Sequence, residues 1–353
     1  MGSGKTSAGQ RAAKMLGMGF ADTDSIVEAR ANRPVARIFA ESGENHFRRM
    51  EAETVADLAE LDNMVIATGG GAVLRPENMR SLRLNGVVIQ LDAAPGILLP
   101  RLRESAERPL LPDCSREGLE KYLTARAPYY MNRDWKIDSG GSVEETAERI
   151  RTIAAKPRIR ICACISGEHP ELDMMTAAAG GATMAELRLD LMPRADAARL
   201  VRKCPLPVIA TDRRGGPRLG DAIKAGCEFV DLKLGSEDYT RNFAMARNAG
   251  CRVIASMHEP KGLPEELPEK GDADLLKLAV GVSTPEDGRR LESLHETLTD
   301  IIIVPLGKFG RDLRIRMPLL GSYLAYCYVG KSTGEGQHEL SEMVELYRGI
   351  GLR

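Results

Sequence analysis

Short apolar runs alternate with longer amphipathic segments along the whole chain, and this alternation restricts the fold more than any other feature. It is typical of βα units, in which parallel strands are joined by helices. After residue 158 the apolar runs are RICACIS, AELRLDL, PVIAT, EFVDLKL, RVIASMH, DLLKLAV, IIIVPLG and YLAYCYV. Eight such units in the segment 158–353 predict a compact (β/α)₈ barrel.

The first part of the chain has fewer strands. The runs GFADTD, NMVIATGG, GVVIQLDA and WKIDSG are separated by helical segments and predict a three-layer α/β/α parallel sheet. A last helix, SVEETAERIRTIAAK, begins with a capping box at Ser142 and Glu145 and is stopped by Pro157. We therefore expect two domains, 1–156 and 157–353.

Composition excludes several classes of function. The net charge is −1, which disfavours a nucleic-acid or anionic-membrane partner. None of the apolar runs approaches the length of a membrane span. The seven cysteines are scattered without metal-like spacing, and several lie inside apolar runs. A reducing, cytoplasmic setting is expected.

The motif GSGKT at residues 2–6 is the second half of a phosphate-binding loop. Its backbone amides can form a nest for phosphate at a helix start, where Lys5 would reach the β- and γ-phosphates and Thr6 would ligate Mg²⁺. Alone, the motif is only moderately specific, and the alternative is a glycine-rich turn before a helix. Such loops follow a buried strand, so we expect the sheet to lack its central strand and the true start to lie upstream.

Further motifs follow in the same part of the chain. FADTD places Asp22 and Asp24 at the carboxyl end of a strand, where ligands of α/β proteins bind. Each motif also has an ordinary structural explanation, such as a turn, a helix cap or a solvated helix face. The others are GENHFRRMEAE, ATGGGAV, ERPLLP and ARAPYY.

Taken in this order, the motifs resemble those of shikimate kinase over most of residues 1–140. The resemblance implies phosphoryl transfer from ATP to a ring hydroxyl of shikimate, driven by positioning and charge stabilisation. It implies an ATP site at Gly2, Ser3, Gly4, Lys5, Thr6 and Arg108, with Lys5 also catalytic. It implies Mg²⁺ at Thr6 and Asp22. It implies a shikimate site at Asp24, Arg48, Gly70, Gly71 and Arg126.

The barrel segment carries charged residues where a buried strand should be apolar. Lys277 lies in the middle of ADLLKLAV, and we expect burial to depress its pKa and make it nucleophilic toward carbonyls. The alternative is a lysine that snorkels from the strand end. Glu186 and Arg188 alternate with apolar neighbours in AELRLDL, and His258 ends VIASMH. Inward-pointing charges of this kind must be paired or functional.

These residues resemble type I 3-dehydroquinate dehydratase over nearly all of 158–353. The resemblance implies Lys277 as the lysine that forms a Schiff base and His258 as the general acid and base. It implies dehydroquinate binding by Glu186, Arg188, Arg213, Arg314, Thr333 and Gln337. No cofactor is implied for this half, because the lysine imine is the electron sink.

One position departs from the family. Where relatives have Glu in a V-D-L-E-L strand, this chain has Lys233 in FVDLKLG. Alternation places Asp231 and Lys233 on the inward face, so we expect Lys233 to lie near His258 and Lys277 and to lower the pKa of both. The alternative is a structural pair with Asp231 or Glu186.

The sequence thus predicts a bifunctional enzyme of the shikimate pathway, with shikimate and 3-dehydroquinate as its small-molecule substrates. A homodimer formed through the barrel is compatible with this interpretation. Two alternatives stay open: an active dehydratase joined to a degenerate kinase-like module, and an unrelated small-molecule kinase fused to a class I aldolase.

Overall fold

The computed structural model describes residues 2–103 and 115–352. The chain divides into two compact units, Met1–Lys156 and Pro157–Arg353. Within the described ranges, the structure contains no helix that is both long and apolar enough to cross a membrane.

The described residues of the first unit, 2–103 and 115–156, contain four short strands, and each coincides with a strand predicted from the sequence. They form two separate parallel pairs, β1 with β2 and β3 with β4. The strands are β1 (Gly19–Asp22), β2 (Met64–Ala67), β3 (Ile89–Asp92) and β4 (Trp135–Asp138). The helices are α1 (Lys5–Leu16), α2 (Thr23–Ala31), α3 (Val35–Ser42), α4 (Glu44–Ala59), η1 (Ala72–Leu74), α5 (Pro76–Asn85), α6 (Pro95–Arg103), α7 (Arg116–Tyr130) and α8 (Val143–Ala154).

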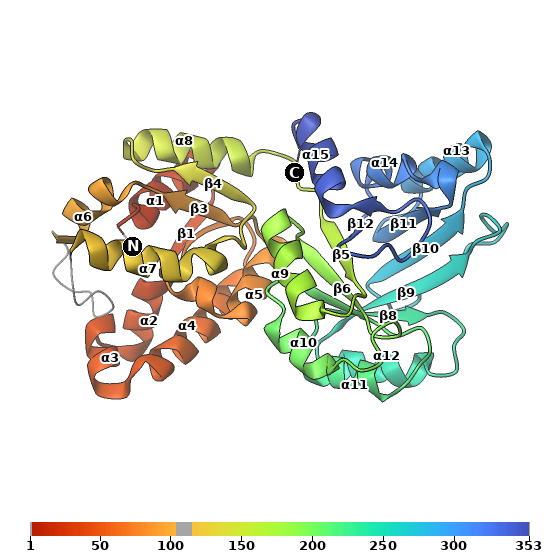
Figure 1. The fold of residues 1–353 in the computed structure, drawn as a ribbon, viewed down its shortest axis with the longest axis horizontal. Coiled ribbons are helices and arrows are strands. Elements are labelled where there is room, and N and C mark those ends of the chain that lie inside the picture. The colour runs from red at the N-terminus through yellow and green to blue at the C-terminus, as the bar shows by residue number, and fades with distance from the viewer. Residues whose placement is uncertain (1, 104–114, 353) are drawn as a thin grey trace. The chain divides into compact units, whose positions relative to one another are not determined.

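Helices α1 and α8 pack together over the β3–β4 pair (Figure 1). Ala8 and Ala12 of α1 meet Ile150 and Ile153 of α8, and the apolar residues of β3 and β4 close this small core. Helix α8 starts with the predicted capping box, because Ser142 and Glu145 bond to each other's backbone N–H.

A cavity of about 450 Å³ lies between the two strand pairs. It is lined by β2 from Met64 to Ala67, by Ile89 and Leu91 of β3, and by Ile150 of α8. In the described part of this unit no backbone ladder joins β2 to β3. The two pairs are thus held together by helix packing, as expected for a sheet without a central strand.

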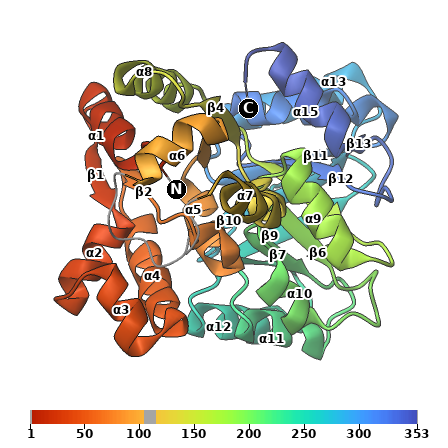
Figure 2. The same cartoon turned by 60° about the vertical axis from the view of Figure 1, so that its left-hand side comes forward.

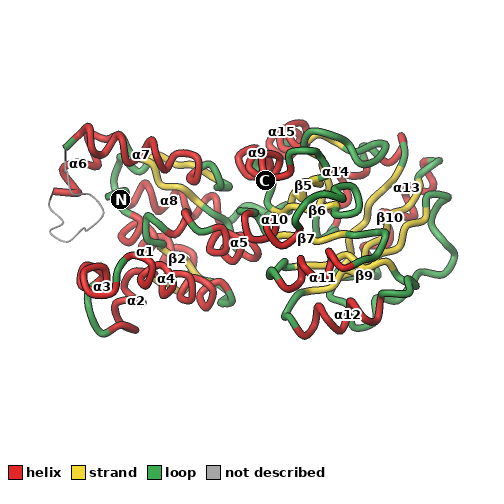
Figure 3. The backbone as a smooth tube through the Cα atoms, turned by 60° about the horizontal axis from the view of Figure 1, so that its bottom comes forward, coloured by secondary structure: helices red, strands yellow, loops and turns green. Residues whose placement is uncertain are grey.

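The second unit is built on one parallel sheet that curls on itself, with helices outside it (Figures 2 and 3). Its first eight strands are the eight predicted ones: β5 (Ile161–Ile165), β6 (Met184–Arg188), β7 (Val208–Thr211), β8 (Phe229–Lys233), β9 (Arg252–Glu259), β10 (Leu275–Gly281), β11 (Ile301–Leu306) and β12 (Ala325–Tyr328). A two-residue strand, β13 (His338–Glu339), was not predicted.

The ladder runs β11-β10-β9-β8-β7-β6-β5-β12-β13. Closure between β11 and β12 is completed by a backbone bond of 2.8 Å from the Tyr323 N–H to the Ile301 carbonyl. The helices are α9 (Pro170–Gly180), α10 (Ala197–Lys203), α11 (Pro217–Lys224), α12 (Tyr239–Asn248), α13 (Pro285–Ser293), η2 (Leu294–Glu296), η3 (Lys308–Gly310), α14 (Leu313–Leu320) and α15 (Leu340–Gly349).

Strands β5 and β7 are buried along their whole length, which explains why they read as continuous or nearly continuous apolar runs. Strands β6 and β10 are equally buried but contain charged residues. The main core is made by Val, Ile, Leu and Ala of the strands against the surrounding helices. The (β/α)₈ prediction is confirmed. The polar side chains that do point inward are therefore exceptions to be explained.

Candidate active sites

The phosphate-binding loop precedes α1 in the first unit. Gly2 and Gly4 have φ of 68° and 78°, a left-handed conformation that suits glycine and few other residues. Gly4 caps the helix without a side-chain bond. The first backbone N–H groups of α1 therefore have no partner within the helix and can receive an anion.

Thr6 and Asp22 lie side by side. The Thr6 hydroxyl donates to Asp22 Oδ2 at 2.7 Å. The other oxygen of Asp22 accepts from the N–H groups of Asp24 and Ser25 and so caps α2. One carboxylate oxygen and one hydroxyl thus face each other beside the loop, a set of hard oxygen donors that fits Mg²⁺.

The glycine-rich loop after β2 allows two charged groups to approach its backbone. A Cβ on Gly69 would lie 2.5 Å from Asp24 Oδ1, and one on Gly71 would lie 2.2 Å from Arg48 Nη1. Arg48 is buried and forms ion pairs with Glu51 at 2.8 Å and Glu44 at 3.1 Å. The loop therefore has glycines because larger residues would displace Asp24 and Arg48.

Arg126 reaches the same loop from α7. Its Nη1 donates to the Gly70 carbonyl at 3.0 Å, and the Tyr130 hydroxyl donates to the same oxygen at 2.8 Å. The Arg126 guanidinium also lies 4.0 Å from the centre of the Tyr122 ring. Two arginines thus flank the glycine loop. Arg108, the other predicted arginine, lies outside the described residues.

One cavity of about 530 Å³ is lined by residues 2–7, by Asp22 and Asp24, by Arg48 and by the glycine loop, residues 68–71. Glu51, fully buried in α4, also lines this cavity and was missed by the sequence analysis. Asp24 Oδ1 and Glu51 Oε1 are buried without a hydrogen-bond partner in the described part of the chain. Burial raises the pKa of both carboxyls. The motif GENHFRRMEAE could have indicated Glu51, because this residue follows Arg48 at the i, i+3 spacing of an ion pair on one helix face.

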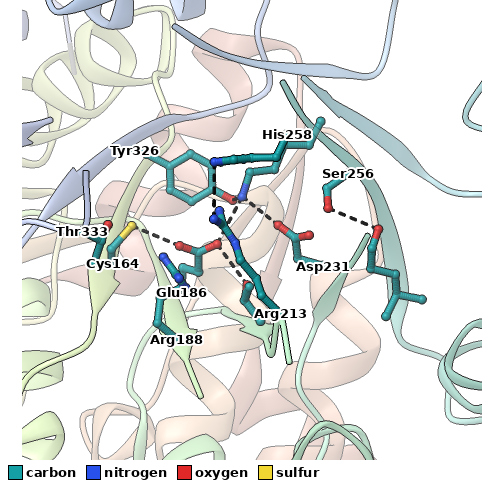
Figure 4. A network of polar contacts seen from close by, with 12 residues as sticks. Cys164, Glu186, Arg188, Arg213, Asp231, Ser256, His258, Tyr326 and Thr333 are labelled. Atoms are coloured by element: carbon teal, nitrogen blue, oxygen red, sulfur yellow. Dashed lines mark hydrogen bonds and ion pairs between the residues drawn. The ribbon is translucent and has the colours of Figure 1, made fainter. Parts of the chain in front are cut away.

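The second site is a polar network inside the barrel, whose members Glu186, Asp231 and Tyr326 are labelled in Figure 4. Lys277 of β10 bonds to all three. Its Nζ donates to Asp231 Oδ2 at 2.7 Å, to the Tyr326 hydroxyl at 3.0 Å and to Glu186 Oε1 at 3.2 Å. Lys277 is only 4% exposed. The alternative of a lysine that snorkels to the surface is therefore wrong.

The expected depression of the Lys277 pKa is also wrong. Burial alone lowers the pKa of this ammonium, but the negative charges of Asp231 and Glu186 outweigh burial and raise it above its usual value. Without substrate, Lys277 is therefore an ammonium ion. It becomes a nucleophile only after it gives up a proton.

Glu186 of β6 connects Lys277 to the two strands beside β6, which are β5 and β7. Its carboxylate accepts from Thr211 at 3.0 Å and from the Cys164 thiol at 3.1 Å. Burial would raise the pKa of Glu186, yet Lys277 and Arg188 together lower it to about 2. Glu186 is thus a carboxylate at neutral pH. Its partner Arg188 forms a two-bond ion pair with Asp190, at 2.8 and 3.0 Å.

His258 lies at the carboxyl end of β9, where active sites of parallel barrels are found. Its Nε2 is 3.3 Å from Arg213 Nη1. Burial and the positive charges of Arg213 and Lys277 lower the pKa of His258 to about 4. The imidazole is therefore neutral at pH 7 and can accept a proton.

The remaining predicted residues surround the same end of the barrel. Arg314 of α14 is buried and donates to the carbonyls of Pro305 at 2.8 Å and Glu335 at 3.3 Å. Thr333 donates to Gln337 Oε1 at 3.0 Å, and Gln337 Nε2 donates to Cys164 Sγ at 3.3 Å. Through Cys164, Thr333 and Gln337 are connected to Glu186.

Lys233 does not take part in this network. The last residue of β8 is exposed, whereas the first four residues of that strand are buried. The predicted lowering of the Lys277 pKa by Lys233 is wrong, and the pKa of His258 is lowered by burial, Arg213 and Lys277. That Lys233 lies beside His258 and Lys277 stays a prediction. Of the three residues that bond to Lys277 Nζ, Asp231 and Tyr326 were not selected by sequence reasoning, although alternation in FVDLKL did place Asp231 inward.

The family model for shikimate kinase matches residues 1–154, and the family model for type I 3-dehydroquinase matches residues 161–353. A shikimate kinase of Thermoanaerobacter pseudethanolicus is 43% identical over 152 residues, which cover 42% of this chain and 89% of that protein. A shikimate kinase of Symbiobacterium thermophilum is 54% identical over 133 residues, covering 37% and 76%.

Solved structures with similar parts include shikimate kinase from Acinetobacter baumannii in complex with shikimate, at 30% identity and a TM-score of 0.42 over 44% of this chain and 88% of that one. The 3-dehydroquinate dehydratase from Aquifex aeolicus has 21% identity and a TM-score of 0.47 over 54% and 99%. By its family matches, the chain belongs to two families, shikimate kinase in residues 1–154 and type I 3-dehydroquinase in residues 161–353.

Proposed function

We propose that this chain catalyses two reactions: ATP-dependent phosphorylation of shikimate in its first unit, and dehydration of 3-dehydroquinate to 3-dehydroshikimate in its second. The observation that supports the second activity most directly is the buried Lys277 ammonium held by Asp231, Glu186 and Tyr326. A purely structural core would place apolar residues there.

In the kinase unit, Lys5 and the loop amides would hold the phosphates of ATP, while Arg48 and Arg126 would take the shikimate carboxylate. Bound Mg²⁺ would be held at Thr6 and Asp22 and would neutralise charge on the phosphates. Asp24 Oδ1 faces the same cavity without a partner in the described residues, so it can accept a hydrogen bond from a shikimate hydroxyl. Catalysis then consists of positioning and charge stabilisation.

In the barrel, Lys277 gives a proton to Asp231, its nearest carboxylate, and attacks the C3 ketone of dehydroquinate. The resulting imine acidifies C2, and neutral His258 removes that proton. His258, now protonated, assists departure of the C1 hydroxyl as water. Arg314 would take the substrate carboxylate, and Glu186, Arg188, Arg213, Thr333 and Gln337 would hold the remaining groups.

Borohydride reduction tests the barrel assignment. With dehydroquinate present, it should add the mass of the reduced ligand to Lys277. Lys277→Ala should add none, while Lys233→Ala, which changes an exposed lysine on β8, should trap like the wild type. Trapping by Lys277→Ala would refute the assignment.

A phosphotransfer assay tests the kinase assignment. Lys5→Ala should abolish shikimate-dependent ATP consumption, and Lys14→Ala, at an exposed position of the same helix, should not. Both variants should dehydrate dehydroquinate normally. Equal phosphotransfer by Lys5→Ala and wild type would contradict the proposal. Light scattering would test separately whether the chain forms a homodimer through its barrel, which the sequence interpretation allows.

A further inference from the structure

The Tyr326 hydroxyl contacts the nitrogen that reacts in the proposed dehydratase. Tyr326 lies on β12, opposite Cys162 of β5, and is 5% exposed. Its oxygen accepts from Lys277 Nζ at 3.0 Å, and Nζ lies 4.2 Å from the centre of the ring. Figure 4 shows Tyr326, Asp231 and Glu186 converging on one point from different strands.

The hydroxyl also has a proton to give. Across residues 2–103 and 115–352, no side chain or carbonyl accepts a hydrogen bond from the Tyr326 O–H. Burial and the nearby carboxylate of Glu186 raise the pKa of the phenol, so the group keeps its proton throughout the accessible pH range. Tyr326 is therefore an acceptor toward Nζ and a donor toward whatever binds beside Nζ.

Imine formation needs a group with both properties. When the Lys277 amine adds to a carbonyl carbon, the first adduct carries a positive nitrogen and a negative oxygen. A proton must leave the nitrogen and another must reach the oxygen, two atoms bonded to the same carbon. Asp231 and Glu186 contact the nitrogen as acceptors. The one proton that Asp231 has received from the ammonium is needed later for the departing water, so neither carboxylate accounts for the proton that first reaches the oxygen.

We propose that Tyr326 is a catalytic residue of imine formation, whose hydroxyl takes a proton from the Lys277 nitrogen while giving its own proton to the former carbonyl oxygen. The inference rests on the proposed dehydratase function. The N–H and phenol O–H bonds break as new O–H bonds form, so the phenol ends neutral and the adduct becomes a neutral carbinolamine. The proton taken earlier by Asp231 then completes the departing water, leaving a protonated imine, and no other reactant is consumed.

The test is the single-turnover rate of borohydride trapping with dehydroquinate. Tyr326→Phe removes only the hydroxyl, and trapping should slow roughly 100-fold, the usual contribution of a positioned proton-transfer group. The final extent should still reach one ligand per chain. As a matched control, Tyr347→Phe removes a buried hydroxyl on α15 that donates to the Ile315 carbonyl at 3.1 Å, and its trapping rate should be unchanged.

Equal trapping rates for Tyr326→Phe and wild type would overturn the relay, and so would a drop in melting temperature without a change in rate. Failure of the wild type itself to trap dehydroquinate would instead refute the proposed dehydratase function.

A second measurement needs no variant. Because two protons move together, the wild-type trapping rate should depend quadratically on the deuterium fraction of the solvent, and a linear dependence would overturn the relay.

Discussion

The charge state of Glu186 gives a quantitative prediction about acid stability. Its pKa is about 2 in the folded barrel against an ordinary value of 4.5. A carboxyl whose pKa is depressed by folding adds stability above its unfolded pKa and loses that stability as pH falls through its folded pKa. Between pH 5 and pH 2, Glu186 should therefore account for a loss of about 3 kcal/mol in the free energy of unfolding.

Glu186→Gln keeps the shape of the side chain and removes its titration. At pH 7 the variant should be less stable than the wild type, because Lys277 loses one of its two carboxylate partners. Between pH 5 and pH 2, however, its unfolding free energy should fall by about 3 kcal/mol less than that of the wild type.

The assay is urea unfolding at several pH values, followed by two signals. Circular dichroism reports both units, whereas the only tryptophan, Trp135, lies in the first unit, so fluorescence identifies that transition separately. A constant stability difference between wild type and variant from pH 5 to pH 2 would show that Glu186 is not held as a carboxylate by Lys277 and Arg188. The depressed pKa would then be wrong.

Three further predictions concern activity. Gly71→Ala places a Cβ against the Arg48 guanidinium, so the KM for shikimate should rise at least about 10-fold while dehydration is unaffected; an unchanged KM would exclude the close approach. For the dehydratase, kcat/KM should fall reversibly as pH drops through about 4, because neutral His258 is the base; a limb near the ordinary histidine value would contradict the lowered pKa. Dehydroquinate and ATP alone should yield dehydroshikimate and no shikimate phosphate by mass spectrometry, because the ketone of dehydroshikimate must first be reduced. Formation of shikimate phosphate without an added reductant would refute this.

Much of the fold could be predicted from local sequence. Every predicted strand is present, because βα units produce their own periodic pattern and turn signals. The gap between β2 and β3 was expected as well, since phosphate-binding loops follow a central strand. Strand β13 was not found, because two residues are too few to generate any alternation.

The position of Lys277, the lysine proposed to react, was likewise available from the sequence, since a charge in the middle of an apolar strand stands out. Its protonation state was not. Lys277, Asp231, Glu186 and Tyr326 come from four different strands, and their distances depend on how the sheet curls. Considered alone, a buried lysine should have a lowered pKa; two carboxylates that only the tertiary structure brings to its nitrogen reverse the sign.

The same limit explains two positions, Lys233 and Glu51, whose burial sequence reasoning did not anticipate. Alternation assigns Asp231 and Lys233 to one face, but β8 ends at Lys233 and that side chain is exposed. In the sequence, Glu51 is one of several charged residues on a helix. In the folded unit its carboxylate lies beside Asp24 and Gly69. Sequence by itself determined the elements and the types of chemistry, because these follow from short-range pattern; burial and long-range neighbours, which set charge, were decided only by the tertiary structure.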